Sequence, residues 1–493
     1  MVIELIGTRI VAPFYGASLY VWSALISTTM MALAVGYFVG GRWADRSRNT
    51  GLSRIVAFAG ILTVLIPWFA RPVLLATDPL GLRAGAFVSA LVLFFPSLSV
   101  LGMAGPFAIK LTTRHVEGVG SSSGSIYAVS TLGSVAGTLL LGFFLFPLLG
   151  SREILIGTGT ALLFVAIVLS LYEQSRLKIS AAFPVCLAIS VIGLSLIPYV
   201  AGADQADPDT RRKYRVLSQR ESLYGWVRVI DQPAKDLRLL TSDASAIGAV
   251  SIRSAANRLA YQKFVEFIPM LKPGMNKALL IGLGAGHMAM TLDKKFQIVT
   301  DTLEIDPVVA EAARDYFAFK PTGRMIVGDA RYEIRRLKGP YDLIILDCFT
   351  GGSEPSYLLT VETLGQLRRL LSRRGLLALN FVAFGDHGNN PALASVAKTI
   401  GQVFTHPLVF TAEPGKDFND FLFIAGKESI ELKTASLTTQ ELQWFQDRQF
   451  SVNSDQGKVL TDNLNLLETL QTKKSEQYRQ LLVEWLGQDI LVR

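Results

Sequence analysis

Residues 277–306 constrain the fold of this chain more than any other stretch. They begin with a short apolar run at 278–281, continue into a glycine-rich turn and end in a second apolar run. The turn holds three glycines, Gly282, Gly284 and Gly286. A buried parallel strand has this apolar pattern, and glycines let the backbone turn tightly and approach a ligand closely. A helix that begins near His287 would direct its free N–H groups at that ligand.

Carboxylates follow at the ends of the neighbouring apolar runs. Glu304 ends the second run, where a carboxylate can accept both hydroxyls of a ribose. Asp329 follows a third run and suits an adenine amino group, and Asp347 follows a fourth. The ligand crevice of an open α/β sheet lies at the carboxyl ends of its strands, so these residues predict a nucleotide-type site. The glycine turn alone would fit a simple strand–helix connection equally well, and the carboxylates favour the site.

Composition divides the chain into two unlike halves. Residues 1–200 are intensely apolar, whereas residues 201–493 have an ordinary soluble composition. The net charge of +8 is typical of Lys and Arg that flank membrane segments, and no aromatic-interleaved basic patch favours nucleic acid as a partner. Cys186 and Cys348 lie in different halves and the four histidines are scattered, so we expect neither a disulfide framework nor a metal site.

The apolar half contains several segments of membrane-spanning length, so we expect the lipid bilayer to be a partner. They lie at 17–40, 55–76, 84–109, 121–149, 152–172 and 179–200. Small residues are frequent in the fourth segment and favour close helix packing.

Basic loops predict the orientation of the chain in the bilayer. The loop at 40–48 and the cluster at 211–215 both carry several Lys or Arg residues and should face the cytoplasm. Five segments lie between them, and an odd number of crossings would put the two on opposite sides. The segment around Pro96 and Pro106 could be broken or re-entrant, which would restore the count. We expect the soluble half to lie in the cytoplasm, where adenosine cofactors are made.

The order of elements predicts an all-α multi-pass membrane domain followed by an α/β domain. Residues 201–213 are expected to be a linker, 214–250 a small antiparallel β unit, 251–430 a Rossmann-like domain and 431–493 a helical extension. The β unit has strand patterns at 215–217, 225–230 and 237–240. Helices are predicted at 255–271, 360–371 and 391–400, and further strands at 375–381, 403–410 and 418–425. Strands that alternate with helices imply a doubly wound, mainly parallel sheet.

The soluble half resembles the spermidine synthase branch of the class I methyltransferase-like fold, over about residues 214–430. The motifs that match are Glu221-Ser-x-Tyr224-Gly225, Tyr261-Gln262, the glycine turn, Glu304-Ile-Asp306, Gly328-Asp329-Ala330-Arg331 and Ile-Ile-Leu-Asp347. The whole chain is similar to bacterial membrane proteins that carry such a domain behind a transporter-like helical region. The resemblance therefore implies a multi-pass protein of the bacterial inner membrane.

The resemblance also implies an activity and a set of roles. In that family an aminopropyl group moves from decarboxylated S-adenosylmethionine to an amine, without a metal. Glu304 would bind the ribose and Asp329 the adenine, while Asp347 would hold and deprotonate the acceptor amine with help from Tyr224. The remaining donor-binding residues would be Gly282, Gly284, Gly286, Asp306, Ala330, Tyr261 and Gln262.

The chain departs from the family pattern at three places. Asn257 and Arg258 stand where an acidic pair is usual, Ala285 replaces an Asp in the glycine turn, and Cys348 to Thr350 lack a second Asp. Arg258, near the methionine tail of the donor, would suit the intact carboxylate of ordinary S-adenosylmethionine better than the bare ammonium of the decarboxylated donor. Arg258 is equally compatible with a plain surface charge.

Three interpretations follow from these observations. The first is a membrane-anchored aminopropyltransferase-like enzyme acting on a small amine or polyamine-like acceptor. The second is an S-adenosylmethionine-dependent methyltransferase with a small or membrane-delivered substrate. The third is a non-catalytic domain that senses an adenosyl ligand for a transport-like helical unit. In each case the sequence is compatible with a homo-oligomer.

Overall fold

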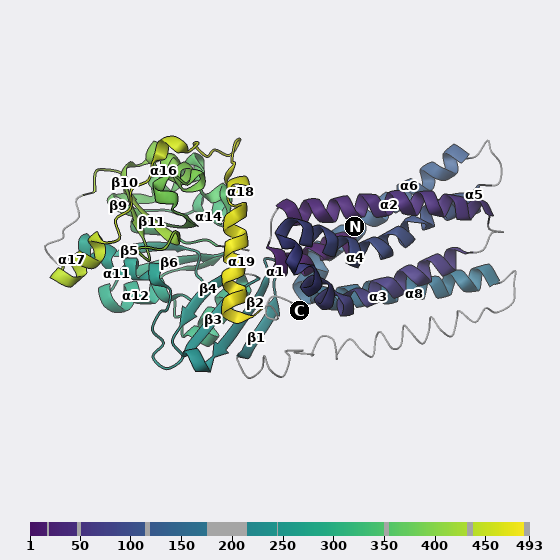
Figure 1. Cartoon of the computed structure of the whole chain (residues 1–493), viewed down its shortest axis with the longest axis horizontal. Coiled ribbons are helices and arrows are strands. Elements are labelled where there is room, and N and C mark those ends of the chain that lie inside the picture. Colours follow the sequence, from purple (N-terminus) through teal and green to yellow (C-terminus); the bar gives the residue numbers. More distant parts are fainter. Residues whose placement is uncertain are drawn as a thin grey trace. The chain divides into compact units, whose positions relative to one another are not determined.

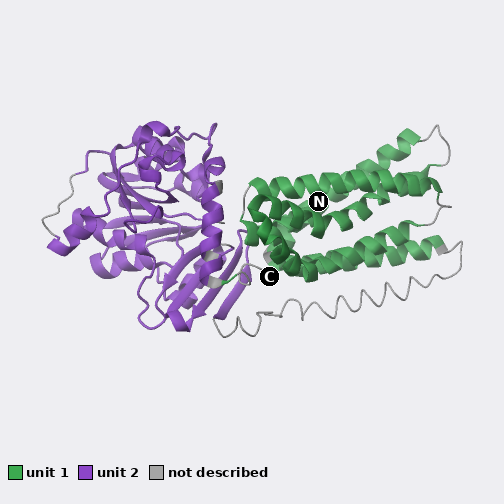
Figure 2. Ribbon diagram, in the orientation of Figure 1, with its two compact units in different colours: residues 1–207, 486–493 green, residues 208–485 purple. Residues whose placement is uncertain are grey.

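The chain folds into two compact units, which are described separately (Figures 1 and 2). The computed structural model describes residues 1–16, 19–46, 51–113, 119–174, 214–243, 245–349, 354–430 and 437–487. Unit 1 comprises residues 1–207 and 486–493, and unit 2 comprises residues 208–485. The predicted segment 179–200 and the predicted linker 201–213 lie outside the described residues.

Within its described residues, unit 1 is helical. Its helices are α1 (Val2–Tyr15), α2 (Leu19–Arg46), α3 (Leu52–Thr77), α4 (Gly81–Gly102), α5 (Ala104–Thr112), α6 (Val119–Leu140), α7 (Phe146–Leu148) and α8 (Ser151–Gln174). A 3-10 turn, Asp78–Leu80, connects α3 to α4, and a π-helical turn, Leu141–Leu145, follows α6. Four helical stretches among the described residues are long and apolar enough to cross a membrane: Leu19–Arg46, Leu52–Thr112, Val119–Leu145 and Ser151–Glu173.

The predicted segments 55–76 and 84–109 fall within one of these stretches, as α3 and as α4 with α5. The predicted break in the second of these segments lies at Met103, between α4 and α5. Pro96 lies inside α4 without ending it. The break therefore comes where the small residue Gly102 ends one helix, rather than at the first proline.

Close helix packing in unit 1 depends on glycines other than those predicted. A Cβ on Gly36 of α2 would lie 2.9 Å from the Cα of Gly102, and one on Gly60 of α3 would lie 2.9 Å from the carbonyl oxygen of Gly159. By contrast, Gly124 and Gly133 of α6 have no described atom within 4 Å of such a Cβ. Gly137 of α6 does lie close to α1, since a Cβ there would be 3.4 Å from the side chain of Val2.

Unit 2 begins with a four-stranded antiparallel sheet in the order β1-β2-β3-β4. Its strands are β1 (Arg215–Glu221), β2 (Trp226–Gln232), β3 (Leu237–Ser242) and β4 (Ser245–Val250). The predicted antiparallel unit is confirmed, and β4 is an additional strand. The sequence of β4 is rich in Ser, Ala and Gly, so it lacks the β-branched alternation from which strands are predicted.

The core of unit 2 is a seven-stranded sheet in the order β10-β11-β9-β8-β5-β6-β7. Its strands are β5 (Lys277–Ile281), β6 (Val299–Glu304), β7 (Met325–Val327), β8 (Tyr341–Leu346), β9 (Leu371–Phe384), β10 (Thr405–Thr411) and β11 (Phe418–Gly426). Strands β5 to β9 pair in parallel, while β11 runs antiparallel to both β9 and β10. This confirms the predicted Rossmann-like, mainly parallel sheet.

Helices accompany the strands of this sheet along the chain. They are α11 (Phe264–Leu271), α12 (His287–Phe296), α13 (Pro307–Phe317), α14 (Ala330–Ile334), α15 (Val361–Leu370), α16 (Pro391–Val403), α17 (Thr439–Gln446), α18 (Leu467–Leu470) and α19 (Thr472–Leu486). The helix predicted at 255–271 begins later, because Ala255 has a positive φ of 55° and a 3-10 turn, Ala260–Lys263, precedes α11. The helical extension predicted from 431 is helical only in α17, α18 and α19 within its described part.

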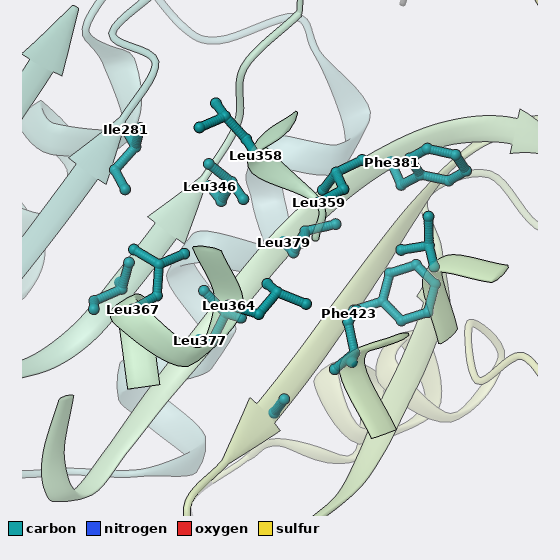
Figure 3. Close-up of a cluster of buried hydrophobic side chains, with 14 of the residues drawn as sticks. Ile281, Leu346, Leu358, Leu359, Leu364, Leu367, Leu377, Leu379, Phe381 and Phe423 are labelled. Atoms are coloured by element: carbon teal, nitrogen blue, oxygen red, sulfur yellow. The ribbon is translucent and has the colours of Figure 1, made fainter. Parts of the chain in front are cut away.

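Apolar side chains cover both faces of the large sheet. Leu279 and Ile281 of β5 belong to one buried cluster, whereas Ala278 and Leu280 belong to another. Figure 3 shows part of the first cluster, in which Leu377 of β9 lies near Leu364 and Leu367 of α15, and Phe381 lies near Leu359. Burial on both faces explains why the parallel strands are nearly continuous apolar runs.

Candidate active site

The glycine turn connects β5 to α12 as the sequence predicts. Gly282, Gly284 and Gly286 have φ values of 90°, 51° and 77°, a region that L side chains rarely adopt. A Cβ on Gly282 would collide with the carbonyl oxygen of Asp347, so this glycine also permits a close approach of two strand ends. The helix α12 begins at His287 directly after the turn, and its N-terminal N–H groups favour negative charge.

Glu304 ends β6 and lies against the glycine turn. It is buried, and its two oxygens accept hydrogen bonds from the backbone N–H of Leu283 (2.9 Å) and of Asp306 (3.0 Å). Burial raises the pKa of Glu304 above its ordinary value, while these backbone donors act in the opposite direction. The carboxylate is thus held rigidly beside the turn, where a ribose would lie.

Asp306 has a structural role in the described geometry. Its side chain caps α13 by accepting the N–H of Val308 at 2.9 Å, and it accepts the hydroxyl of Ser222 at 2.5 Å. Ser222 belongs to the motif before Tyr224, so this bond joins the small sheet to the core. Burial raises the pKa of Asp306, and the hydroxyl of Ser222 opposes that shift.

Asp329 and Ala330 follow β7 at the next strand end. Asp329 caps α14 by accepting the N–H of Tyr332 at 2.9 Å, and its other oxygen lies 3.5 Å from the hydroxyl of Tyr357. Ala330 is buried. Burial, followed by the charge of Asp329, raises the pKa of Tyr357 to about 12, so this phenol remains a hydrogen-bond donor at neutral pH.

Asp347 follows β8 and is fixed by two side chains. The hydroxyl of Tyr261 donates to Oδ2 at 2.8 Å, and the amide of Asn380 donates to Oδ1 at 3.0 Å. Gln262 in turn donates to the Tyr261 hydroxyl at 3.2 Å. Burial raises the pKa of Asp347, whereas the bonds from Asn380 and Tyr261 lower it. The predicted pair Tyr261 and Gln262 therefore positions the predicted catalytic carboxylate.

The three predicted carboxylates, Glu304, Asp329 and Asp347, lie at the carboxyl ends of parallel strands. Burial raises the pKa of Cys348 well above its ordinary value, and the charges of Glu304, Asp347 and Asp329 raise it further, in that order. Strands β8, β5, β6 and β7 are neighbours in that order and pair in parallel, so their carboxyl ends lie at one edge of the sheet. The structure thus brings these residues together.

Tyr224 is placed differently from the other predicted residues. Its side chain is exposed, and its backbone N–H donates to the hydroxyl of Ser222 at 3.0 Å. The phenol that bonds Asp347 is instead that of Tyr261. Arg258 donates to Asp236 at 3.0 Å and is half exposed, which corresponds to the surface-charge interpretation.

A second polar group beside Asp347 was not predicted. Asn380 also donates to Asp420 of β11 at 3.3 Å, and burial raises the pKa of Asp420 to about 7. Glu354 accepts the backbone N–H of Val382 at 2.7 Å, the amide of Gln471 at 3.0 Å and the ammonium of Lys474. Polar residues inside the predicted strands 375–381 and 418–425 could have indicated Asn380 and Asp420. Nothing local distinguishes Lys474 from other lysines.

The chain is similar in sequence to two classes of transferase, an aminopropyltransferase and a methyltransferase. It is 33% identical over 177 residues to a polyamine aminopropyltransferase of Vibrio vulnificus, covering 34% of this chain and 58% of that protein. It is 30% identical over 241 residues to an N-terminal histidine N-methyltransferase of Emericella nidulans, covering 43% of this chain and 42% of that protein. The chain therefore spans about half the length of these curated relatives.

A solved spermidine synthase structure from Thermotoga maritima matches 49% of this chain and 82% of that chain, with 19% identity and a TM-score of 0.37. No family model matches the chain. Unit 2 is similar in sequence to the aminopropyltransferase, and its seven-stranded sheet has a Rossmann-like order of strands. The chain thus carries, behind a helical region with apolar helices, a spermidine synthase-like domain with a Rossmann-like methyltransferase fold.

Proposed function

We propose that unit 2 is a transferase that moves an alkyl group from the sulfonium of an adenosyl donor to the nitrogen of an amine. The first candidate donor is decarboxylated S-adenosylmethionine, from which the group would be aminopropyl. The observation that carries the proposal is Asp347, held by Tyr261 and Asn380 at the strand edge that also presents Glu304 and Asp329.

The donor would bind along the glycine turn. Glu304 is oriented by two backbone N–H groups and keeps acceptor capacity for ribose hydroxyls. Asp329 would accept the adenine amino group, with Tyr357 beside it. Gly282 and Gly284 let the backbone approach the donor closely. Asp306 and Ala330 would support this cradle by capping α13 and packing at the start of α14.

Asp347 would then act on the acceptor amine. Its carboxylate holds the ammonium, accepts one proton and leaves a neutral nitrogen with a free electron pair. That pair forms the new C–N bond as the C–S bond breaks and its electrons return to sulfur, which becomes a neutral thioether. The donor supplies an already activated leaving group, so alignment by Asp347, Tyr261 and Asn380 is the main contribution of the protein. Tyr224 would assist Asp347 in this step.

Methyl transfer from S-adenosylmethionine is the second candidate. The likeness to the histidine N-methyltransferase favours it, and Ala285 in the glycine turn removes an acid expected for polyamine chemistry. The two reactions leave different products, because aminopropyl transfer yields 5′-methylthioadenosine and methyl transfer yields S-adenosylhomocysteine.

The test uses the full-length protein purified in detergent. It is incubated with each donor and a panel of small amines, and both thioether products are quantified by mass spectrometry. Formation of 5′-methylthioadenosine supports the first candidate, and S-adenosylhomocysteine supports the second. If calorimetry shows donor binding while neither product forms with any amine, the domain is a ligand sensor and the transferase proposal is wrong.

We further propose that unit 1 anchors this enzyme in a bacterial inner membrane, with unit 2 in the cytoplasm. The four apolar stretches support the anchoring, and the basic loop at 40–48 supports its orientation. The bilayer and a small amine would then be its partners, with no nucleic acid. A fluorescent-protein fusion at the C-terminus, which emits only in the cytoplasm, tests the orientation, and an active alkaline phosphatase fusion there would contradict it.

A further inference from the structure

A buried lysine lies inside the acceptor side of the proposed site. Lys474 of α19, the yellow helix in Figure 1, is only 3% exposed and forms an ion pair with Glu354, whose side chain is 4% exposed. The Lys474 ammonium also lies 4.9 Å from the ring centroid of Phe381 and 5.3 Å from that of Phe349. A carboxylate with aromatic faces is a typical binding site for an ammonium. Here the chain fills that site with its own side chain.

This ammonium cage adjoins the reacting carboxylate. Phe349 lies two residues after Asp347, and Glu354 accepts the backbone N–H of Val382, two residues beyond the Asn380 that bonds Asp347 at 3.0 Å. The charges of Asp347, Glu354 and Lys474 all act on Asp420, which shares the amide of Asn380. The cage and Asp347 are therefore held by the same stretch of β9.

Three buried amide oxygens near the site lack a hydrogen-bond donor and indicate which groups a ligand would carry. Among the described residues, Gln262 Oε1, Asn380 Oδ1 and Gln471 Oε1 are buried and have no hydrogen-bond partner. Gln262 is 8% exposed and donates its amide N–H to Tyr261. Asn380 is 9% exposed and donates to Asp347 and Asp420. Gln471 is 2% exposed and donates to Glu354. A buried acceptor without a donor is costly, so these oxygens favour a ligand that carries N–H groups.

The cage already holds one positive nitrogen, that of Lys474. The site holds three carboxyls, those of Asp347, Asp420 and Glu354. Glu354 is neutralised by Lys474, and Asp420 has a pKa of about 7, so it is only partly charged at neutral pH. Asp347 is left as the main uncompensated carboxylate. A second ammonium that reached the cage would meet the Lys474 ammonium, with Glu354 already paired.

We propose that Lys474 supplies the second ammonium of this site from the protein itself, so that the acceptor is a monoamine and diamines are excluded. The inference rests on the proposed function, since it concerns the acceptor of that reaction. Lys474 is thus a specificity-determining residue, and α19 is the wall of the acceptor site.

The test compares n-butylamine with 1,4-diaminobutane, which differ only in the second amino group. The full-length protein in detergent is assayed with both donors as wild type, as Lys474→Met and as Lys473→Met. Lys473 is the exposed neighbour on α19 and serves as the matched control. We expect wild type and Lys473→Met to prefer n-butylamine in kcat/KM by about tenfold or more, and Lys474→Met to reverse the preference, because like charges in a dry site repel strongly.

A binding readout keeps the test independent of turnover and of folding losses. Lys474→Met leaves Glu354 buried without a cation, so the variant should melt at a lower temperature. We expect 1,4-diaminobutane, but not n-butylamine, to raise its melting temperature. The double variant Lys474→Met/Glu354→Gln should not respond to the diamine.

The inference is overturned if wild type prefers 1,4-diaminobutane, or if Lys474→Met and Lys473→Met show the same amine preference and thermal response. Failure of the proposed function looks different. No product would then form from either donor in any variant, while the selective rescue of Lys474→Met by the diamine would still report an ammonium site next to Glu354.

Discussion

The hydroxyl of Tyr261 donates a 2.8 Å hydrogen bond to Oδ2 of Asp347, across 86 residues of sequence. The bond joins the 3-10 turn before α11 to the end of β8, and it presents one carboxylate at the edge of the sheet in a single orientation. The site proposed for the acceptor amine is built around this pair.

Replacing Asp347 with Asn should abolish turnover while donor affinity changes by less than about tenfold. The amide keeps the shape and a hydrogen bond, but it cannot accept the proton of the acceptor amine. Product formation and calorimetric donor binding are measured together. Asp293→Asn, on the exposed side of α12, is the control and should behave as wild type. Loss of donor binding in Asp347→Asn would instead assign this residue to the donor.

Glu304→Gln should weaken donor binding by about 1.5–3 kcal/mol, the range for a hydrogen bond to a charged group. This corresponds to a loss of roughly 10- to 150-fold in affinity for either thioether product, measured by calorimetry. Glu311→Gln removes an exposed carboxylate on α13 that pairs with Arg220, and it should leave the affinity unchanged. An unaltered Kd in Glu304→Gln would remove Glu304 from the site.

Gly282→Ala should destabilise the protein more than Gly274→Ala. Both glycines have a φ of 90°, so alanine is strained by about 1 kcal/mol or more at either position. Only at Gly282 would the new Cβ also collide with the carbonyl oxygen of Asp347, because Gly274 has no described atom within 4 Å. Thermal unfolding of the two variants in detergent isolates the effect of the collision. Equal melting temperatures would show that β5 and β8 can separate at this point without cost.

Acceptor affinity should increase as pH rises through about 7. Below that pH the buried carboxyl of Asp420 is neutral, and above it the carboxylate adds a negative charge that attracts an amine still carrying its proton. The pKa is raised by burial and by the charges of Asp347 and Glu354, while Asn380 and Lys474 oppose the shift. Asp420→Asn removes the titrating group, so the KM of the amine should lose this step. A step that persists in the variant would assign it to another group.

Asp420 should also make the stability of the fold depend on pH, and here the effect of rising pH is unfavourable. The pKa of Asp420 is higher in the folded protein than in an unfolded chain, so the folded state binds more protons between about pH 4 and 7. The free energy of unfolding should therefore fall as pH rises through this window and level off above it. Chemical unfolding of unit 2 in the full-length protein should show a shallower decrease for Asp420→Asn than for wild type. An identical pH profile would mean that Asp420 is charged throughout.

Local signals in the sequence were sufficient for the scaffold of the site. Apolar runs that end in glycine or acid mark the ends of parallel strands, and the alternation with helices orders those strands in one sheet. Gly282, Glu304, Asp329 and Asp347 lie at neighbouring strand ends for this reason. Each lies at the end of its own strand or within two residues of it, so no knowledge of distant contacts was required to place them at one edge.

Tertiary structure alone decided which side chains meet at that edge. Tyr224 and Tyr261 are chemically alike, and only the packing of the turn before α11 brings Tyr261 to Asp347. Gln471, directly before α19, and Lys474 of α19 reach Glu354 across 117 and 120 residues. The sequence pattern of α19 is that of an ordinary charged surface helix. Periodicity predicts which face of an element is buried, but not which distant element covers it. Burial of Lys474 depends on that covering contact, and so does the acceptor class proposed here.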